Sequence, residues 1–73
     1  LDLEEAVLGA MLIDKKGVDD VIDIISADVF YKKQHQLIYQ AIFELFQNSE
    51  PIDLLTVAEQ LRKTGNLEAA GSD

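Results

Sequence analysis

The chain has 73 residues, of which 48% are hydrophobic and none is cysteine. This length accommodates one small domain with a single core, and the absence of cysteine excludes a disulfide framework or a thiolate metal site. Fourteen acids and six bases give a formal net charge of −8, which disfavours direct binding to the phosphates of nucleic acid. No apolar run is long enough for a membrane span, and no basic segment precedes an apolar stretch as in a signal peptide.

Residues 2–13 are expected to form the first helix. Asp2 is a suitable N-cap, and Glu5 three residues later completes a capping-box-like pair. Gly9 disfavours a helix by about 1 kcal/mol relative to alanine, so we expect a neighbouring helix to approach closely there. The apolar residues recur at helical spacing and predict one buried stripe, which consists of Leu3, Val7, Leu8, Met11 and Leu12.

A second helix is expected over residues 15–25, with Asp14 as its N-cap. Its buried face consists of Val18, Val21, Ile22 and Ile25. The acids of this helix are interpreted as a solvated face, with a docking face for a basic partner as the sharper alternative. These acids are Asp19, Asp20 and Asp23. Residues 26–28 then form a turn, in which Ser26 or Asp28 can cap the following segment.

The longest helix is expected over residues 32–47, just after the aromatic bulk of Phe30. Its broad apolar stripe predicts a central helix that contacts several others and leaves apolar surface for a partner. The stripe contains Leu37, Ile38, Ala41, Ile42, Leu45 and Phe46, with Tyr39 and Phe43 on its flanks. His35 is expected to be a half-buried structural residue bonded to a nearby backbone or acidic group. The sequence shows no convergent partners that would give it a metal-binding or catalytic role.

Residues 48–51 form the clearest turn of the chain, which ends at Pro51. Asp53 is the expected N-cap of a fourth helix that extends to Lys63, and Thr56 stands where it can face this cap. The core residues of this helix are Leu54, Val57, Ala58 and Leu61. Gly65 is expected to end the helix as its C′ residue. Asn66 then caps a further helical turn over residues 67–70.

Every apolar run fits a 3.6-residue period, and none alternates as a strand does. The predicted fold class is therefore all-α: a compact multihelical orthogonal bundle of about four main helices plus short helical turns. The four glycines are too scattered for a phosphate-binding loop, and no serine lies in a nucleophile elbow. We therefore expect a non-catalytic domain, without a metal or cofactor of its own, that acts by docking to other proteins.

One extended pattern of residues covers nearly the whole chain. It contains Glu4–Asp14 (EEAVLGAMLID), Asp28–Tyr31 (DVFY), His35, Ile38, Ile42, Pro51–Asp53, Thr56, Leu61, Gly65, Leu67 and Gly71. In this order and spacing the chain resembles the N-terminal domain of the bacterial hexameric replicative DNA helicases, the DnaB family. In that family the domain continues into further helices, a helical hairpin, a linker and an ATPase domain. The resemblance therefore implies that residues 1–73 are a single helical domain truncated before those parts.

The resemblance implies a domain that joins its copies into a collar on the helicase ring. It also implies docking of the C-terminal domain of primase, contact with the helicase loader and a cytoplasmic location, with ATP and magnesium only in the missing ATPase domain. Asp2, Glu4 and Glu5 lie at an expected exposed helix start and match acidic positions of the family's first helix. They are the candidate primase-facing residues, with helix capping as the alternative. The residues expected to be structural are Gly9, Phe30, His35, Pro51, Asp53 and Gly65.

Two alternatives from other functional classes stay open at this point. A stand-alone regulator of helix-turn-helix type would need a basic recognition helix, and the last full helix has only Arg62 and Lys63, at its far end. A gel-shift assay at low salt distinguishes this alternative from a docking domain. A small enzyme would be supported by any turnover that depends on His35.

Overall fold

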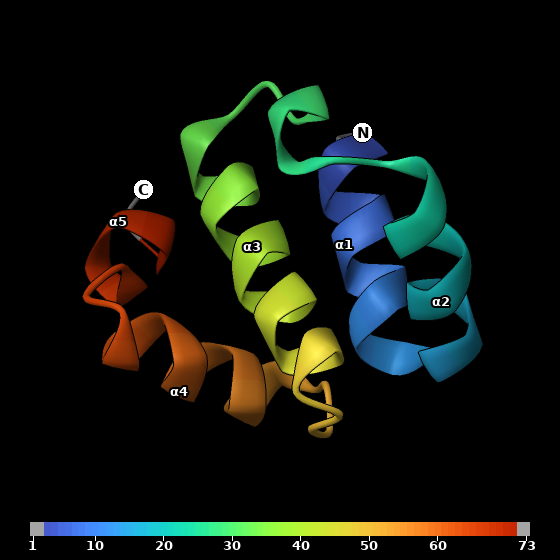
Figure 1. Ribbon diagram of the computed structural model, residues 1–73. Coiled ribbons are helices and arrows are strands. Elements are labelled where there is room, and N and C mark those ends of the chain that lie inside the picture. Colours follow the sequence, from blue (N-terminus) through green and yellow to red (C-terminus); the bar gives the residue numbers. More distant parts are fainter. Residues whose placement is uncertain (1–2, 72–73) are drawn as a thin grey trace.

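The computed structural model describes residues 3–71, and in that part of the chain it contains helices and no strand. The elements are α1 (Leu3–Ile13), α2 (Lys15–Ile24), the 3-10 helix η1 (Ala27–Val29), α3 (Lys33–Gln47), α4 (Leu54–Lys63) and α5 (Leu67–Gly71). Figure 1 shows α3 at the centre, with α1 and α2 on one side and α4 and α5 on the other. The predicted all-α multihelical bundle is confirmed, and η1 replaces the turn expected at residues 26–28.

Two of the predicted helix starts carry the expected side-chain caps. Asp14 accepts a hydrogen bond from the backbone N–H of Lys16 at 3.0 Å. Asp53 accepts one from the N–H of Thr56 at 2.9 Å, and the Thr56 hydroxyl in turn accepts from the N–H of Asp53 at 2.9 Å. This reciprocal pair satisfies two of the N–H groups that a helix start leaves without a helical partner. Asp53 therefore fixes where α4 begins, and the loop with the exposed Pro51 precedes it.

Gly65 ends α4 as predicted, in the left-handed region with φ +77°. Its N–H donates to the carbonyl of Arg62 at 3.1 Å, and the N–H of Asn66 donates to that of Leu61 at 2.8 Å. These two bonds are a Schellman motif. The carbonyl of Asn66 then accepts from the N–H of Ala70 at 2.9 Å, so α5 follows directly.

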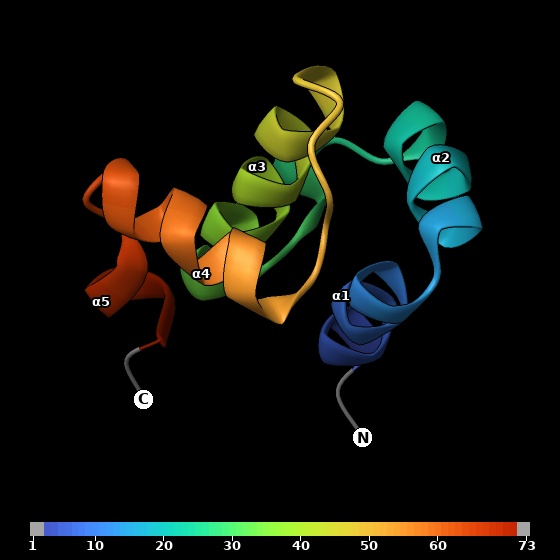
Figure 2. The same ribbon diagram turned by 90° about the horizontal axis from the view of Figure 1, so that it is seen from below.

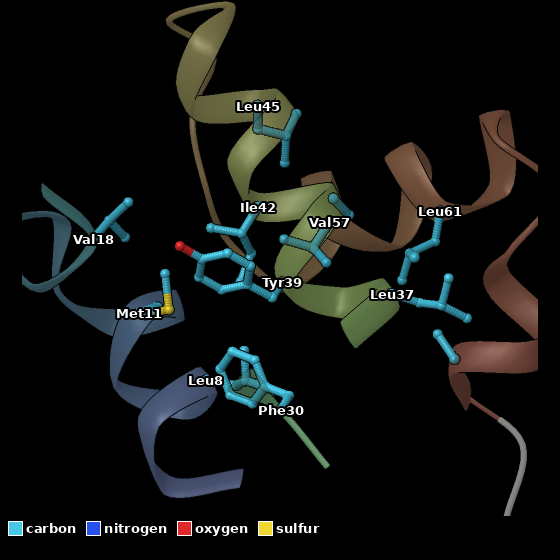
Figure 3. Close-up of a cluster of buried hydrophobic side chains, with 12 residues drawn as sticks. Leu8, Met11, Val18, Phe30, Leu37, Tyr39, Ile42, Leu45, Val57 and Leu61 are labelled. Carbon is cyan, nitrogen blue, oxygen red and sulfur yellow. The ribbon is translucent and has the colours of Figure 1, made fainter. Parts of the chain in front are cut away.

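The core lies between α3 and the helices on either side of it. Ile42, at the centre of α3, is 0% exposed. Figure 3 shows two groups of side chains against it, one from α1, α2 and the segment before α3, the other from α4. The buried hydrophobic residues are Leu8, Met11, Val18, Phe30, Leu37, Tyr39, Ala41, Ile42, Leu45, Val57, Leu61 and Ala70.

Tyr39 corrects the sequence analysis, because it lies in the core and not on a flank of the apolar stripe. It is 2% exposed, and its ring packs on Phe30 with centroids 5.3 Å apart. Its hydroxyl donates to the backbone carbonyl of Ile25, so the polar end of the ring is satisfied where it is buried. Burial raises the pKa of this hydroxyl. Tyr39 thereby ties α3 to the end of α2.

Three apolar residues expected in the core are exposed instead. Leu3 is 72% exposed, Leu54 is 71% exposed and Phe46 is 36% exposed. The helical period identifies the face on which a residue lies. It does not show how far a neighbouring helix extends along that face. Leu3 and Leu54 each open a helix, and Phe46 lies in the last turn of one, where the described elements leave them uncovered.

The prediction that a neighbouring helix approaches closely at Gly9 is also wrong. A methyl group on its Cα would meet no atom of a neighbouring element within 4 Å. Gly9 therefore carries the cost of a helical glycine without the packing gain that would offset it.

We expect the same substitution to act in opposite directions at Gly9 and Gly65. Gly9→Ala is expected to stabilise the chain by about 0.5–1 kcal/mol, because alanine favours a helix and the space is free. Gly65→Ala is expected to destabilise it by about 1 kcal/mol, because its φ is positive. Urea unfolding followed by circular dichroism measures both. A loss of stability in Gly9→Ala would contradict the absence of a close neighbour.

The core assignment is tested by Ile42→Val, with Leu54→Ala as the exposed control. Ile42→Val is expected to lower the free energy of unfolding by about 1 kcal/mol, because it leaves a small void in packed surroundings. Leu54→Ala is expected to change it by less than about 0.5 kcal/mol, because the side chain is already in solvent. A larger loss in Leu54→Ala than in Ile42→Val, measured by urea unfolding, would reverse the assignment.

Candidate partner-docking surface

The Glu4 carboxylate joins the start of α1 to the start of α3. It accepts hydrogen bonds from the backbone N–H of Tyr31 at 2.6 Å and of Lys32 at 3.4 Å. Its Oε1 also lies 2.6 Å from Nδ1 of His35. Lys32 is the N-cap of α3, and its own side chain makes no capping hydrogen bond. Glu4 therefore supplies, from another helix, acceptors for the N–H of this N-cap and of the residue before it.

This arrangement lowers the pKa of Glu4. The largest cause is the hydrogen bond from the N–H of Tyr31, followed by the one from His35. Each of these bonds favours the charged carboxylate over the neutral acid. Glu4 is therefore held as an anion at the positive end of the α3 dipole.

His35 has the structural role that the sequence analysis gave it. It is buried, at 7% exposed, where a half-buried residue was expected; it bonds an acidic side chain, as expected, although that acid lies 31 residues earlier in the chain. Its ring stands edge-on to Phe30, with centroids 6.5 Å apart and an interplanar angle of 79°. Phe30 itself is 4% exposed, so both residues anchor the segment before α3 to the core.

The three candidate primase-facing acids prove different from one another. Asp2 lies outside the described residues. Glu4 is not an exposed residue of the helix start: a quarter of its side chain is exposed, and the carboxylate is engaged with α3. Glu5 is exposed, as expected. The contacts of Glu4 were missed because nothing near it in the sequence indicates a partner about 30 residues away.

Glu5 stands at the edge of a surface hollow of about 540 Å³. Residues of α1, α3 and α5 line it, among them Leu8, Gly9, Ile38 and Ala70. The hollow has an apolar lining and a charged rim, since Glu5 and Lys32 line it as well. Such a surface suits a protein partner that contributes both an apolar anchor and polar contacts.

The acids of α2 lie apart from this hollow. Asp19, Asp20 and Asp23 are exposed, which confirms the expected solvent-facing side of the helix. In the following turn, Ser26 makes no side-chain cap to η1. The side chain of Asp28, the other expected cap, is outside what the structure describes.

The described residues contain no group of three histidine, cysteine or acidic side chains that could hold a metal ion. Within residues 3–71, no helix has the length and apolar character needed to cross a membrane.

Comparisons with known proteins agree with this architecture. The family model for the DnaB-like helicase N terminal domain matches residues 1–73. Replicative DNA helicase DnaB of Rhodothermus marinus is 48% identical over 71 residues, which are 97% of this chain and 8% of that protein. Replicative DNA helicase DnaB of Leifsonia xyli subsp. xyli is 40% identical over 68 residues, which are 93% of this chain and 15% of that protein.

A solved structure matches the fold as well. The crystal structure of the N-terminal domain of DnaB helicase from Mycobacterium tuberculosis superposes with a TM-score of 0.90 at 40% sequence identity. The match covers 96% of this chain and 50% of that one. Fold and sequence together define a helical domain of the replicative DNA helicases. The chain belongs to the DnaB-like helicase N-terminal domain family, and its 73 residues lack the ATPase domain of the full-length helicase.

We expect Glu4→Gln to destabilise the chain at neutral pH, because an amide replaces the charged acceptor at the start of α3. The folded pKa of Glu4 lies below its ordinary value of 4.5. Its stabilising contribution is therefore complete above that value and is lost as the pH falls through the folded pKa. Urea midpoints of the two proteins should differ at neutral pH and converge in acid.

Glu5→Gln is the matched control, since it removes a charge from the same helical turn and leaves the contacts of Glu4 intact. It should change the pH dependence much less than Glu4→Gln does. If the urea midpoints of Glu4→Gln and of the unaltered chain stay equally far apart down to acidic pH, the role assigned to the Glu4 carboxylate is contradicted.

Proposed function

We propose that this chain is a non-catalytic protein-interaction domain of a replicative DNA helicase, which supports assembly of the collar of the hexamer and docks primase during DNA replication. The observation that carries the proposal is the match to the solved DnaB N-terminal domain, at a TM-score of 0.90 and 40% identity over 96% of the chain. The composition supports it, because a chain of net charge −8 without a catalytic constellation is suited to binding other proteins.

The proposal extends to the rest of the helicase. The chain spans 8% and 15% of the two DnaB relatives described above. We propose that residues 1–73 act as one helical domain and that a helical hairpin, a linker and the ATPase domain follow in the full-length protein. ATP and magnesium then act in the ATPase domain, in the cytoplasm, and this domain binds neither cofactor.

The proposed partners are other helicase protomers, the C-terminal domain of primase and the helicase loader. The surface proposed for primase is the rim of the hollow beside Glu5, together with Asp2. Glu5 supports this assignment because it is exposed and stands next to an apolar lining. Glu4 takes part indirectly, since it fixes the position of α1 against α3.

Direct binding of nucleic acid is not part of the proposal. Arg62 and Lys63 lie in the last turn of α4, and the Arg62 guanidinium donates two hydrogen bonds to Glu59. An arginine bonded in this way has fewer donors left for phosphates. α4 therefore lacks the basic character of a recognition helix.

We expect the double variant Asp2→Lys, Glu5→Lys to weaken binding of the primase C-terminal domain about tenfold, because charge reversal at a rim opposes electrostatic complementarity. Titration calorimetry with the helicase that carries this domain measures the dissociation constant. The circular dichroism spectrum should change little, because Glu4 keeps its contacts with α3 and loss of the expected Asp2 cap affects only the first turn of α1.

Glu68→Lys is the matched control, since Glu68 is an exposed acid on α5 and does not line the hollow. It should bind primase as the unaltered helicase does. Unchanged affinity in the Asp2, Glu5 variant would refute the assigned surface. Absence of primase binding in the unaltered helicase would refute the proposed function itself.

A further inference from the structure

A second surface lies between α2 and α3, away from the hollow beside Glu5. In the view of Figure 2, α2 and α3 lie on the same side of α1. One hollow of about 600 Å³ is lined from the end of α2 and from α3. Another of about 530 Å³ is lined from α2, from the end of α3 and from the loop that follows. Gln47 lines both, so the two hollows adjoin at this residue; together they are called here the α2–α3 groove.

Apolar side chains form much of this groove. Ile22, Ile25 and Phe43 line the first hollow and are only partly buried. Phe46, 36% exposed, and Ile52 line the second. This apolar surface is left open by the described elements, and it explains why Phe46 is exposed although it belongs to the apolar stripe of α3.

The charge along the groove has one sign. Among the lining residues, all in the described part of the chain, the charged ones are Asp19, Glu44 and Glu50. Asp20 and Asp23 are exposed on the same helix as Asp19. An apolar groove with acidic edges is complementary to an amphipathic helix with a basic polar face.

The bases near the groove offset this charge only in part. Lys63 lines a smaller hollow together with Glu50, so it offsets the acid at the α4 end. Lys16 is exposed in the first turn of α2. The α2 side of the groove keeps three exposed acids, Asp19, Asp20 and Asp23, and Asp19 is the one that lines it.

Pairing of this surface with the same surface of a second copy is disfavoured. Each copy has a formal net charge of −8, so two acidic faces would repel each other. A small ligand does not fit either, because Gln40, Gln47 and Glu50 in the lining are exposed and would leave much of the ligand in water.

We propose that the α2–α3 groove binds an amphipathic helix with a basic polar face, provided by another protein. The apolar side of that helix covers Ile25, Phe43 and Phe46, and its lysine or arginine residues face the acids of α2. The proposal does not depend on the function proposed above, because the groove shares no residue with the hollow beside Glu5.

The probe is a fluorescein-labelled synthetic helix of about 18 residues, or five turns, with leucine at positions i, i+3, i+4 and i+7 and lysine elsewhere. A scrambled peptide of the same composition has no apolar face. Fluorescence anisotropy should give at least about tenfold tighter binding for the amphipathic peptide. Equal affinity for the two peptides would overturn the proposal, because it would show attraction to charge alone.

Two variants locate the binding surface. Asp19→Lys is expected to weaken binding of the amphipathic peptide about fivefold, whereas the same charge change in Glu68→Lys, on α5, leaves it unchanged. Gln47→Trp is expected to weaken it about tenfold or more by filling the point where the hollows meet. Gln47 is exposed, so this variant should fold even if the charge reversal does not. Equal losses in Asp19→Lys and Glu68→Lys would overturn the assignment.

Amide chemical shifts provide an independent map. With the amphipathic peptide, the largest changes are expected at Gln40, Phe43 and Gln47. Changes centred on α4 and α5, or on the hollow beside Glu5, would overturn the proposal. A dimer of the chain in sedimentation, dissociated by Gln47→Trp, would overturn it in favour of a second copy as the occupant.

Discussion

The fold depends on one carboxylate that connects two distant parts of the chain. Glu4 accepts from the backbone of Tyr31 and Lys32 and bonds His35, so α1 holds the segment at which the central helix begins. α3 in turn contacts α1, η1, α4 and α5. A helix start needs acceptors for its first N–H groups. Because an acceptor for the start of α3 comes from α1, local helix formation and tertiary packing are coupled at this point, on the side of α3 that faces α1.

Like Glu4, some other acids of the chain have a role inside the fold. Asp14, Asp53 and Glu4 accept hydrogen bonds from backbone N–H groups at helix starts, so their charge is used within the fold. Glu5 and the acids of α2 are exposed. Asp14 and Asp53 are exposed as well, so a role inside the fold does not by itself hide an acid from a partner. The formal net charge shows that the chain is acidic, but the structure is needed to show which part of that charge faces outward.

Interactions between residues close together in the sequence could be predicted, whereas those between distant residues could not. The Asp53–Thr56 cap and the turn at Gly65 involve residues at most a few positions apart, and both were predicted correctly. Tyr39 and Leu54 were assigned wrongly because burial depends on which element covers a face. The exposed Glu5 of the candidate site was predicted, whereas the role of Glu4 was not. The role of His35 could be predicted only in part. A buried histidine indicates an acidic or backbone partner, but the sequence does not identify Glu4 among fourteen acids.

A chain of this size cannot cover all of its apolar surface by itself, since a small domain buries a smaller fraction of its surface than a large one. The central helix is the clearest example. Ile42 and Leu45 are buried in the core, whereas Ile38 and Phe43 line two separate surface hollows. Partners that cover these hollows would add apolar contacts and stabilise the folded chain by mass action. Because both hollows border the same helix, a partner bound at one of them would help to hold the helix that forms the other.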